Sequence, residues 1–139
     1  WDLRRGAVAH ELRGHADALS GVQVDWVQDR ALSWSAGDTT LRLWDLAKGA
    51  VVHVMEREPI GKFGVQVDWE WNSVLCWTED VWGNADFTLE LWDLERGEVQ
   101  HVMSHHTDAV RGASMSRRQV RASGAGGAGQ LVSTGKSCL

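Results

Sequence analysis

The sequence predicts an all-β chain built from repeated units of four short antiparallel strands. The triplet Trp-Asp-Leu occurs at residues 1–3, 44–46 and 92–94, at spacings of 43 and 48 residues. Between these triplets, apolar and polar residues alternate in short runs, which is the pattern of half-buried strands. Nine tryptophans and a single proline accompany these runs, and tryptophan is a residue type enriched in strands. Repetition at this period is typical of an architecture built from equivalent units.

The repetition extends beyond the triplets to longer matched segments. The hexapeptide Gly-Val-Gln-Val-Asp-Trp at residues 21–26 recurs at residues 64–69. The segment 40–46 recurs at residues 88–94 with a single change, arginine to glutamate. Between these two blocks the second unit is five residues longer, around residues 81–85. Matches of this length do not arise by chance.

Each unit divides into four strands separated by turns. In the first complete unit, strands are expected near residues 22–26, 30–35, 41–43 and 51–55. Gly37 and Gly49 lie in the turns that precede the third and fourth of these strands. A single small sheet of four strands cannot bury both of its faces alone.

The order of motifs within the unit resembles the WD repeat, which is named for its tryptophan–aspartate pair. Gly14-His15 is followed by alternating apolar positions, then by Ser33, Asp38 and finally Trp44-Asp45. The WD-repeat family folds as a β-propeller, in which each repeat supplies the last strand of one blade and the first three strands of the next. The resemblance covers roughly residues 1–110.

The resemblance implies an incomplete β-propeller of four-stranded antiparallel blades, with about two whole blades and a partial blade at each end. The whole blades are expected at residues 19–56 and 62–103, a partial blade at residues 1–12, and the start of another blade from residue 108. Because propellers hold about four to eight blades, we expect a fragment of a larger propeller, completed by further blades of a parent chain or by self-association.

The C-terminal segment differs in composition from the repeats. Residues 111–139 are rich in glycine and carry five basic side chains and no acidic one. They lack the apolar spacing of a blade, so we expect a degenerate or disordered tail.

The resemblance also implies a structural role for four polar residues of the first unit. In WD repeats a histidine, a serine or threonine, an aspartate and a tryptophan form a hydrogen-bonded tetrad, and here these are His15, Ser33, Asp38 and Trp44. A buried imidazole and a buried indole each need a partner, and one chain of bonds satisfies both. A catalytic triad uses the same residue types, but triads are recognised by geometry and the fold accounts for this set.

The second unit departs from this pattern. Arg57-Glu58 stands at the place of the Gly-His pair and Cys76 at the place of the serine, whereas Asp86 and Trp92 are retained. We therefore expect the tetrad to be absent from the second unit.

Two tryptophans without a counterpart in the other unit are candidates for partner binding. Trp71 falls in the loop between the first two strands of its unit, and Trp82 falls in the five-residue insertion. Exposed tryptophans are typical of binding hot spots, and loops carry function on rigid scaffolds. The candidate partner-binding residues are Trp71, Glu79, Asp80 and Trp82.

Other recurring residues are interpreted as structural. Trp34 and Trp77 occupy equivalent second-strand positions, which favours packing between blades. His10, His53 and His101 recur in three successive fourth strands. Because fourth strands lie at the outer rim of a propeller, far from one another, common ancestry is favoured over a zinc site or a pH switch.

The predicted function is a non-catalytic protein–protein interaction scaffold that binds other proteins or peptides. The sequence shows no nucleophile–base pair, metal-ligand cluster or phosphate-binding loop, so no cofactor or metal is expected. The alternative is a regulatory or targeting segment of an enzyme whose catalytic domain lies outside this chain. Nucleic-acid binding through the basic tail is a third and less favoured hypothesis.

Composition bounds the expected location of the protein. No apolar run approaches the roughly 20 residues that span a bilayer, and the N-terminus lacks the pattern of a signal peptide. Two cysteines do not make a disulfide framework. We therefore expect an intracellular protein, cytoplasmic or nuclear, without membrane association.

Overall fold

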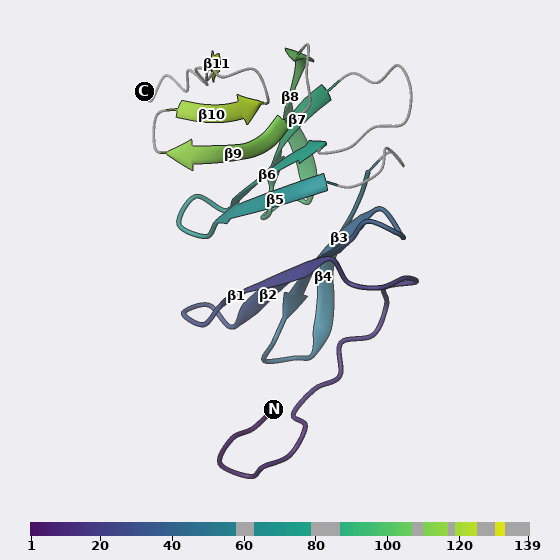
Figure 1. Ribbon diagram of the computed structural model, residues 1–139. Coiled ribbons are helices and arrows are strands. Elements are labelled where there is room, and N and C mark those ends of the chain that lie inside the picture. The colour runs from purple at the N-terminus through teal and green to yellow at the C-terminus, as the bar shows by residue number, and fades with distance from the viewer. Residues whose placement is uncertain (58–62, 79–86, 107–109, 117–118, 125–129, 133–139) are drawn as a thin grey trace. The chain divides into compact units, whose positions relative to one another are not determined.

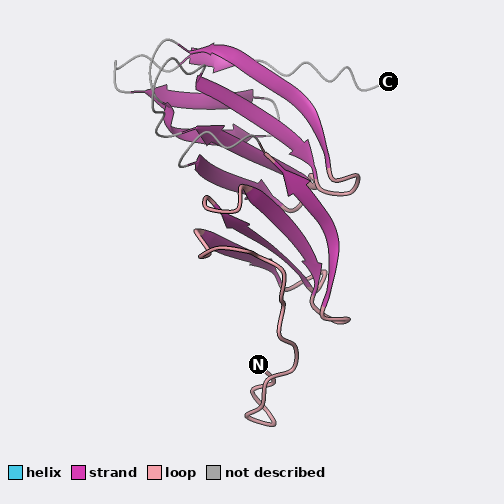
Figure 2. Ribbon diagram, turned by 90° about the vertical axis from the view of Figure 1, so that its right-hand side faces the viewer, coloured by secondary structure: helices cyan, strands magenta, loops and turns pink. Residues whose placement is uncertain are grey.

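The computed structural model describes residues 1–57, 63–78, 87–106, 110–116, 119–124 and 130–132 of the chain. These residues form strands, turns and loops and contain no helix (Figure 2). It follows that no helix capable of crossing a membrane occurs among them. The chain forms two compact units, Trp1–Pro59 and Ile60–Leu139.

The first unit contains one four-stranded antiparallel sheet, with its strands in chain order (Figure 1). The strands are β1 (Gly21–Asp25), β2 (Arg30–Ser35), β3 (Thr40–Asp45) and β4 (Ala50–Glu56). Asp29 and Gly49 adopt positive φ angles of 50° and 65° in two of the turns, a conformation that aspartate and glycine tolerate best. Turn residues at the expected places thus separate the four expected strands.

The second unit contains a sheet of the same kind. Its strands are β5 (Phe63–Asp68), β6 (Ser73–Thr78), β7 (Phe87–Asp93) and β8 (Glu98–His106). They also pair in chain order and antiparallel. The prediction of an all-β fold with two four-stranded antiparallel sheets is therefore confirmed for the residues that the structure describes.

The repeated sequence produces a repeated strand register. Gly21 of β1 lies opposite Trp34 of β2, and Gly64 of β5 lies opposite Trp77 of β6. In both sheets the pairing of the last two strands shifts beside the repeated Trp-Asp pair. The repeated segments therefore share a strand register, including this shift beside the Trp-Asp pair.

One hydrophobic cluster of the second unit lies on one face of its sheet. Leu75 and Leu89 are fully buried there and form a cluster with Trp77 and Leu91. Ala113, which belongs to the following strand, packs against this cluster. Strand alternation places these side chains on a single face, because residues opposite one another in the register share a face.

Three described segments between residues 110 and 132 form strands, in the part of the chain (residues 111–139) that was expected to be a degenerate or disordered tail. They form a three-stranded antiparallel sheet, in the order β11-β10-β9, from β9 (Val110–Ser116), β10 (Gln119–Gly124) and β11 (Gln130–Val132). The physical reason is that the apolar face of the second sheet offers Ala113 a surface to pack on. Burial against a neighbour can order strands whose own composition is poor in apolar residues.

Residues 1–20 run to the start of β1 as a loop with one isolated antiparallel bridge (Figure 1). Asp2 and Ala7 exchange two backbone hydrogen bonds, of 2.8 and 3.3 Å, across this bridge. Of the partial blade expected at residues 1–12, the structure shows only this bridge.

Candidate functional site

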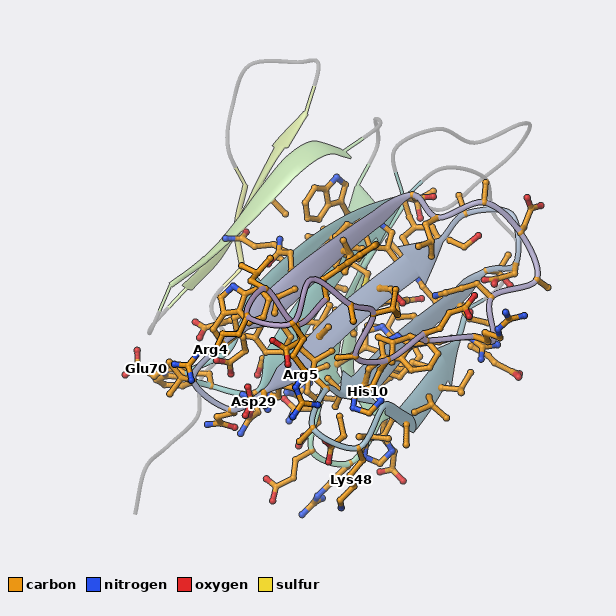
Figure 3. All side chains as sticks on the ribbon, turned by 90° about the horizontal axis from the view of Figure 1, so that it is seen from below. Arg4, Arg5, His10, Asp29, Lys48 and Glu70 are labelled. Atoms are coloured by element: carbon orange, nitrogen blue, oxygen red, sulfur yellow. The ribbon has the colours of Figure 1, made fainter. Side chains whose placement is uncertain are left out.

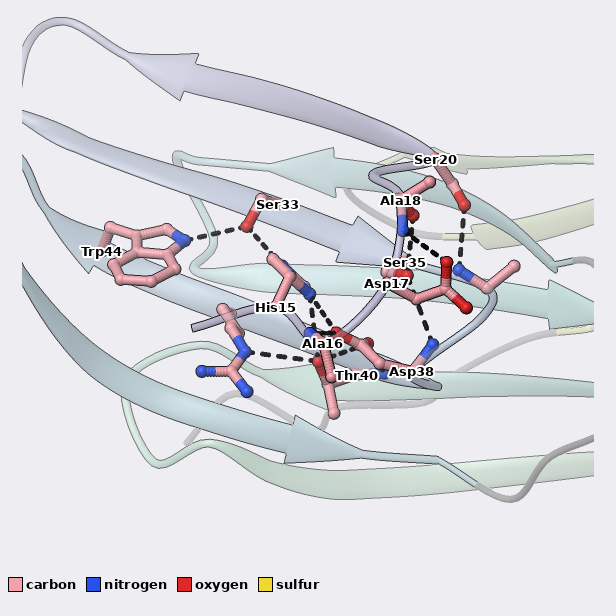
Figure 4. Close-up of polar contacts among 12 residues, drawn as sticks. His15, Ala16, Asp17, Ala18, Ser20, Ser33, Ser35, Asp38, Thr40 and Trp44 are labelled. Atoms are coloured by element: carbon pink, nitrogen blue, oxygen red, sulfur yellow. Dashed lines mark hydrogen bonds and ion pairs between the residues drawn. The ribbon is translucent and has the colours of Figure 1, made fainter. Parts of the chain in front are cut away.

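Four polar residues of the first unit join in one chain of hydrogen bonds (Figure 4). The Nε1 atom of Trp44 donates to Ser33 Oγ at 2.8 Å. Ser33 Oγ lies 2.8 Å from Nε2 of His15, and Nδ1 of His15 lies 2.7 Å from Oδ2 of Asp38. The structure thus brings together all four residues that the resemblance implies.

The network assigns the direction of each hydrogen bond. The Asp38 carboxylate can only accept, so we assign His15 the tautomer that donates from Nδ1 and accepts at Nε2. The hydroxyl of Ser33 therefore donates to Nε2 and accepts from the indole. Each member satisfies its neighbour, and none is left with an unpaired donor.

Asp38 is the most heavily bonded member of the tetrad. Its Oδ1 accepts from the backbone N–H and the hydroxyl of Thr40, at 2.9 and 2.7 Å, and its Oδ2 accepts from the N–H of Ala16 at 2.9 Å. Burial acts to raise the pKa of Asp38, but the hydrogen bonds from Thr40, His15 and Ala16 outweigh it and hold the pKa well below its usual range. The carboxylate is therefore ionised at neutral pH.

The tetrad and two further hydrogen bonds fasten the segment before β1 to the sheet. Ser35 Oγ donates to the carbonyl of Ala18 at 2.8 Å, and the N–H of Ala36 donates to Ser20 Oγ at 2.9 Å (Figure 4). The same segment lies close to β3, because a Cβ on Gly14 would meet the guanidinium of Arg42. The bonds thus connect the incoming chain to β2 and to the turn that follows it.

The tetrad is poorly placed for reaction with a substrate. The side chains of His15 and Asp38 are 9% and 7% exposed, and Ser33 is 5% exposed with both of its hydrogen-bonding directions occupied. A nucleophilic hydroxyl must reach an incoming carbonyl. The arrangement therefore suits a structural role.

In the second sheet, the indole N–H of the repeated tryptophan donates to a different acceptor. Trp92 Nε1 donates to Oε2 of Glu90 at 3.2 Å. Cys76, fully buried on β6, lies opposite Glu90 in the strand register. Of the remaining positions, Glu58 and Asp86 lie outside the described residues. The carboxylate of Glu90, two residues before Trp92 on the same strand, thus accepts the indole hydrogen bond that the serine hydroxyl accepts in the first sheet.

This role of Glu90 was missed in the sequence reasoning, although a signal for it existed. The two matched segments 40–46 and 88–94 differ only at Arg42 and Glu90. The same pair of sheets also exchanges Ser33 for Cys76 at the opposing register position. The exchange at Arg42 and Glu90 is the only change between the two matched segments, and it faces the exchange of Ser33 for Cys76, which indicates a compensating change.

Trp71 lies at the tip of the β5–β6 turn and is 47% exposed. Its backbone N–H donates to Asp68 Oδ1 at 3.1 Å, and its carbonyl accepts from Ser73 Oγ at 3.0 Å. The next residue, Asn72, has a positive φ of 50°. The other candidate partner-binding residues, Glu79, Asp80 and Trp82, lie outside the described residues.

The equivalent turn of the first sheet presents a tryptophan that the sequence reasoning assigned to a half-buried strand. β1 ends at Asp25, and Trp26 and Val27 follow it in the turn with exposed fractions of 78% and 92%. A signal for this position was present in the sequence, because a turn sequence immediately follows the repeated hexapeptide that Trp26 ends. Burial could not be foreseen, because it depends on which surfaces cover the end of the strand.

Asp25 holds this turn in place. Its Oδ1 accepts from the N–H groups of Val27 and Gln28, at 3.0 and 3.3 Å, and its Oδ2 accepts from Arg30 Nε at 2.9 Å. Burial acts to raise the pKa of Asp25, but the bonds from Arg30, Val27 and Gln28 outweigh it and lower the pKa. The β3–β4 turn, with Lys48, lies at the same end of the sheet as Asp29 of this turn (Figure 3).

The other recurring residues have structural surroundings. The indoles of Trp34 and Trp77 lie over Gly21 and Gly64 of the neighbouring strands, so closely that a Cβ at either glycine would collide with them. His10 lies 3.2 Å from the carbonyl of Ala47 through Nε2. Within the described ranges, no group of three histidine, cysteine or acidic side chains is arranged to hold a metal ion.

Comparison of the sequence with models of known protein families gives no match, and comparison with curated proteins gives no significant match. The function of the chain is therefore inferred from its own side chains. Among them, the exposed indoles on well-anchored turns are the features that the fold does not require.

Proposed function

We propose that this chain is a segment of a WD-repeat β-propeller and acts as a protein–protein interaction scaffold. The observation that supports this function is the recurrence of an exposed indole on the first hairpin turn of each sheet. Trp26 is 78% exposed and Trp71 is 47% exposed. The proposed partners are other proteins or peptides, bound without chemical change.

Hydrogen bonds hold both turns in a fixed conformation, which favours a role of their tryptophans in binding a partner. An aspartate at the end of the first strand accepts backbone N–H groups of the turn in each case, Asp25 in one and Asp68 in the other. Asp29 and Asn72 adopt the same positive φ of 50° at equivalent positions. A side chain presented from a rigid turn loses little conformational entropy when a partner binds.

An exposed indole can contribute strongly to such binding. Its two rings bury a large apolar area and its N–H offers one hydrogen bond. Tryptophan is enriched among residues whose truncation costs about 2 kcal/mol or more of binding free energy. Because neither Trp26 nor Trp71 belongs to the buried core, the fold itself gives no reason for a tryptophan at either place.

The proposal is tested by affinity capture with the wild-type chain and with the double variant Trp26→Ala/Trp71→Ala. We expect proteins enriched by the wild type to fall about thirtyfold in capture by the variant, the equivalent of about 2 kcal/mol. The melting temperature should change little, because both side chains are exposed. Gln28→Ala, an exposed change in the same turn as Trp26, serves as the matched control.

Two outcomes contradict the proposal. One is capture of the same proteins at the same level by the wild type and the double variant. The other is a lowered melting temperature in the double variant, which would show that the indoles stabilise the fold.

A further inference from the structure

The first ten residues repeat the segment that connects the third strand to the fourth in both sheets. Residues 1–10, 44–53 and 92–101 share Trp-Asp-Leu at their first three places, and a glycine, a valine and a histidine at the sixth, eighth and tenth. Asp2 and Ala7 pair antiparallel, as do the residues at the same two places of the other copies. Residues 1–10, here called the N-terminal hairpin, therefore have both the sequence and the turn of this connection.

The N-terminal hairpin belongs to no sheet among the described residues, where its strand pairing is limited to that single bridge. Trp1, Leu3 and Val8 are 80%, 93% and 55% exposed. The tryptophans at the place of Trp1 in the other two copies are 3% and 6% exposed. Apolar surface left in water lacks the stabilisation that burial gives. The hairpin thus carries the sequence of a fourth strand without the sheet that such a strand joins.

The three-stranded sheet has the opposite deficiency. Its third strand, β11, pairs with β10 on one side. In the two complete sheets the third strand pairs with a fourth strand on its other side. Within the part of the chain that the structure describes, no strand occupies that edge of β11. The unpaired backbone groups of a strand edge are a template for addition of a further strand.

The strand register matches this edge to the N-terminal hairpin. Gly112 of β9 lies opposite Ser123 of β10, as a glycine of β1 and of β5 lies opposite a second-strand tryptophan. The residue two places before Ser123 lies opposite Leu131, just as the residue two places before each tryptophan lies opposite a leucine of β3 or β7. That leucine lies opposite the recurring fourth-strand histidine, which in the hairpin is His10.

We infer that residues 7–12 of one chain add to β11 of a second copy as its fourth strand, and that the exchange is reciprocal. The inference rests on the proposed propeller, because the number of strands calls for the second copy. The eleven strands of the described residues, together with residues 7–12, amount to three four-stranded sheets. Propellers hold about four to eight such sheets. One chain falls short of this range, two copies fall within it, and three copies exceed it.

The contacts of residues 7–12 within their own chain are compatible with this exchange. The Nε2 atom of His10 donates to the carbonyl of Ala47 at 3.2 Å, in the β3–β4 turn. Among the described residues, no hydrogen bond between backbone groups holds residues 8–13. The segment can therefore keep its contact with the first sheet while it pairs with β11 of the second copy. The three-stranded sheet of that copy then becomes the neighbour of the first sheet.

The mass of the wild-type chain in solution tests the number of copies. Sedimentation equilibrium should give twice the 15.4 kDa of one chain. The mass of a single chain, or of three chains or more, overturns the inference.

Disulfide cross-linking tests which strands meet. The register places Val8 of one copy opposite Val132 of the other, as Val51 lies opposite Trp44. Directly opposite residues have Cβ atoms about 4.5–5.5 Å apart, which a small shift brings within reach of a disulfide. Val8→Cys and Val132→Cys, each combined with Cys138→Ser, are refolded together and oxidised. We expect a covalent dimer from the mixture and none from either variant alone.

Val27→Cys mixed with Val132→Cys is the matched control. Val27 is 92% exposed in the β1–β2 turn, so random collisions would trap it at least as readily as Val8. An equal yield of covalent dimer in this control overturns the inference. Both cysteines placed on one chain, at positions 8 and 132, should join different chains, and a bond within a single chain overturns the exchange.

Failure of this inference can be distinguished from failure of the proposed function. Trp26→Ala/Trp71→Ala should leave the mass of the dimer unchanged, because neither indole lies in the exchanged strand. A wild-type monomer that still captures proteins through these indoles overturns the exchange alone. A dimer whose capture of proteins is the same with and without the indoles overturns the proposed scaffold function alone.

Discussion

Replacement of Ser33 by alanine removes the only group that links the buried indole to the imidazole. Ser33 Oγ lies 2.8 Å from Trp44 Nε1 and 2.8 Å from His15 Nε2. Trp44 is 3% exposed and the His15 side chain 9%, so bulk water has little access to either nitrogen. One buried polar group left without a partner costs about 1–3 kcal/mol. Because the two nitrogens belong to one hydrogen-bond network, their costs do not add in full, and we expect the free energy of unfolding to fall by about 2–4 kcal/mol.

The loss is measured by urea unfolding followed by circular dichroism. With a slope of about 1–3 kcal/mol per molar urea, the midpoint should fall by about 1–2 M. The slope should not change, because the same surface is exposed on unfolding. The matched control is Cys76→Ala in the second sheet, where Trp92 keeps its bond to Glu90 and a smaller loss is expected.

Either of two results would refute this reasoning. A loss below about 1 kcal/mol for Ser33→Ala would mean that the nitrogens find other partners at no cost. An equal loss for Cys76→Ala would mean that volume, and not the hydrogen bonds, sets the effect.

Three further changes test other parts of the structure. The lowered pKa of Asp38 means that its ionised form stabilises the fold above the ordinary pKa of about 4, and that this stabilisation is lost as pH falls from there towards the folded-state pKa. Asp38→Asn should therefore flatten the melting temperature against pH below about pH 4; parallel curves for the two proteins would argue against it. Gly64→Ala places a Cβ against the indole of Trp77 and should lower stability by about 1–3 kcal/mol in thermal melting, whereas an unchanged melting point would show that the indole can move aside. Arg42→Glu combined with Ser33→Cys copies the second sheet into the first, and should recover about 1 kcal/mol relative to Ser33→Cys alone; strict additivity of the two changes would contradict the compensating role of Glu90.

Much of the fold could be predicted from the sequence because the decisive signals are local. Alternation of apolar and polar residues sets the strands, and turn residues such as Gly49 set their ends. The tetrad residues could be named because the resemblance places His15, Ser33, Asp38 and Trp44 at characteristic positions. These inferences need only neighbours along the chain or an established repeat pattern.

The remaining features could not be predicted because they depend on what covers a surface. Trp26 and Trp69 end the same hexapeptide, yet the first is 78% exposed and the second is partly buried. Residues 111–139 read as a tail, but the described segments 110–116, 119–124 and 130–132 form strands, and Ala113 packs against the second sheet. Composition alone does not reveal such a neighbour.

Local sequence specifies the repeating four-stranded units and the polar residues that recur within them, since period-2 alternation and turn chemistry act over a few residues. The folded arrangement places Glu90 against the indole of Trp92, brings Arg42 close to Gly14 and leaves Trp26 exposed. Each of these depends on distances between strands or on burial by distant residues. Hydrogen bonds and solvent exposure are settled in space, and one identical segment can meet different surroundings in its two copies.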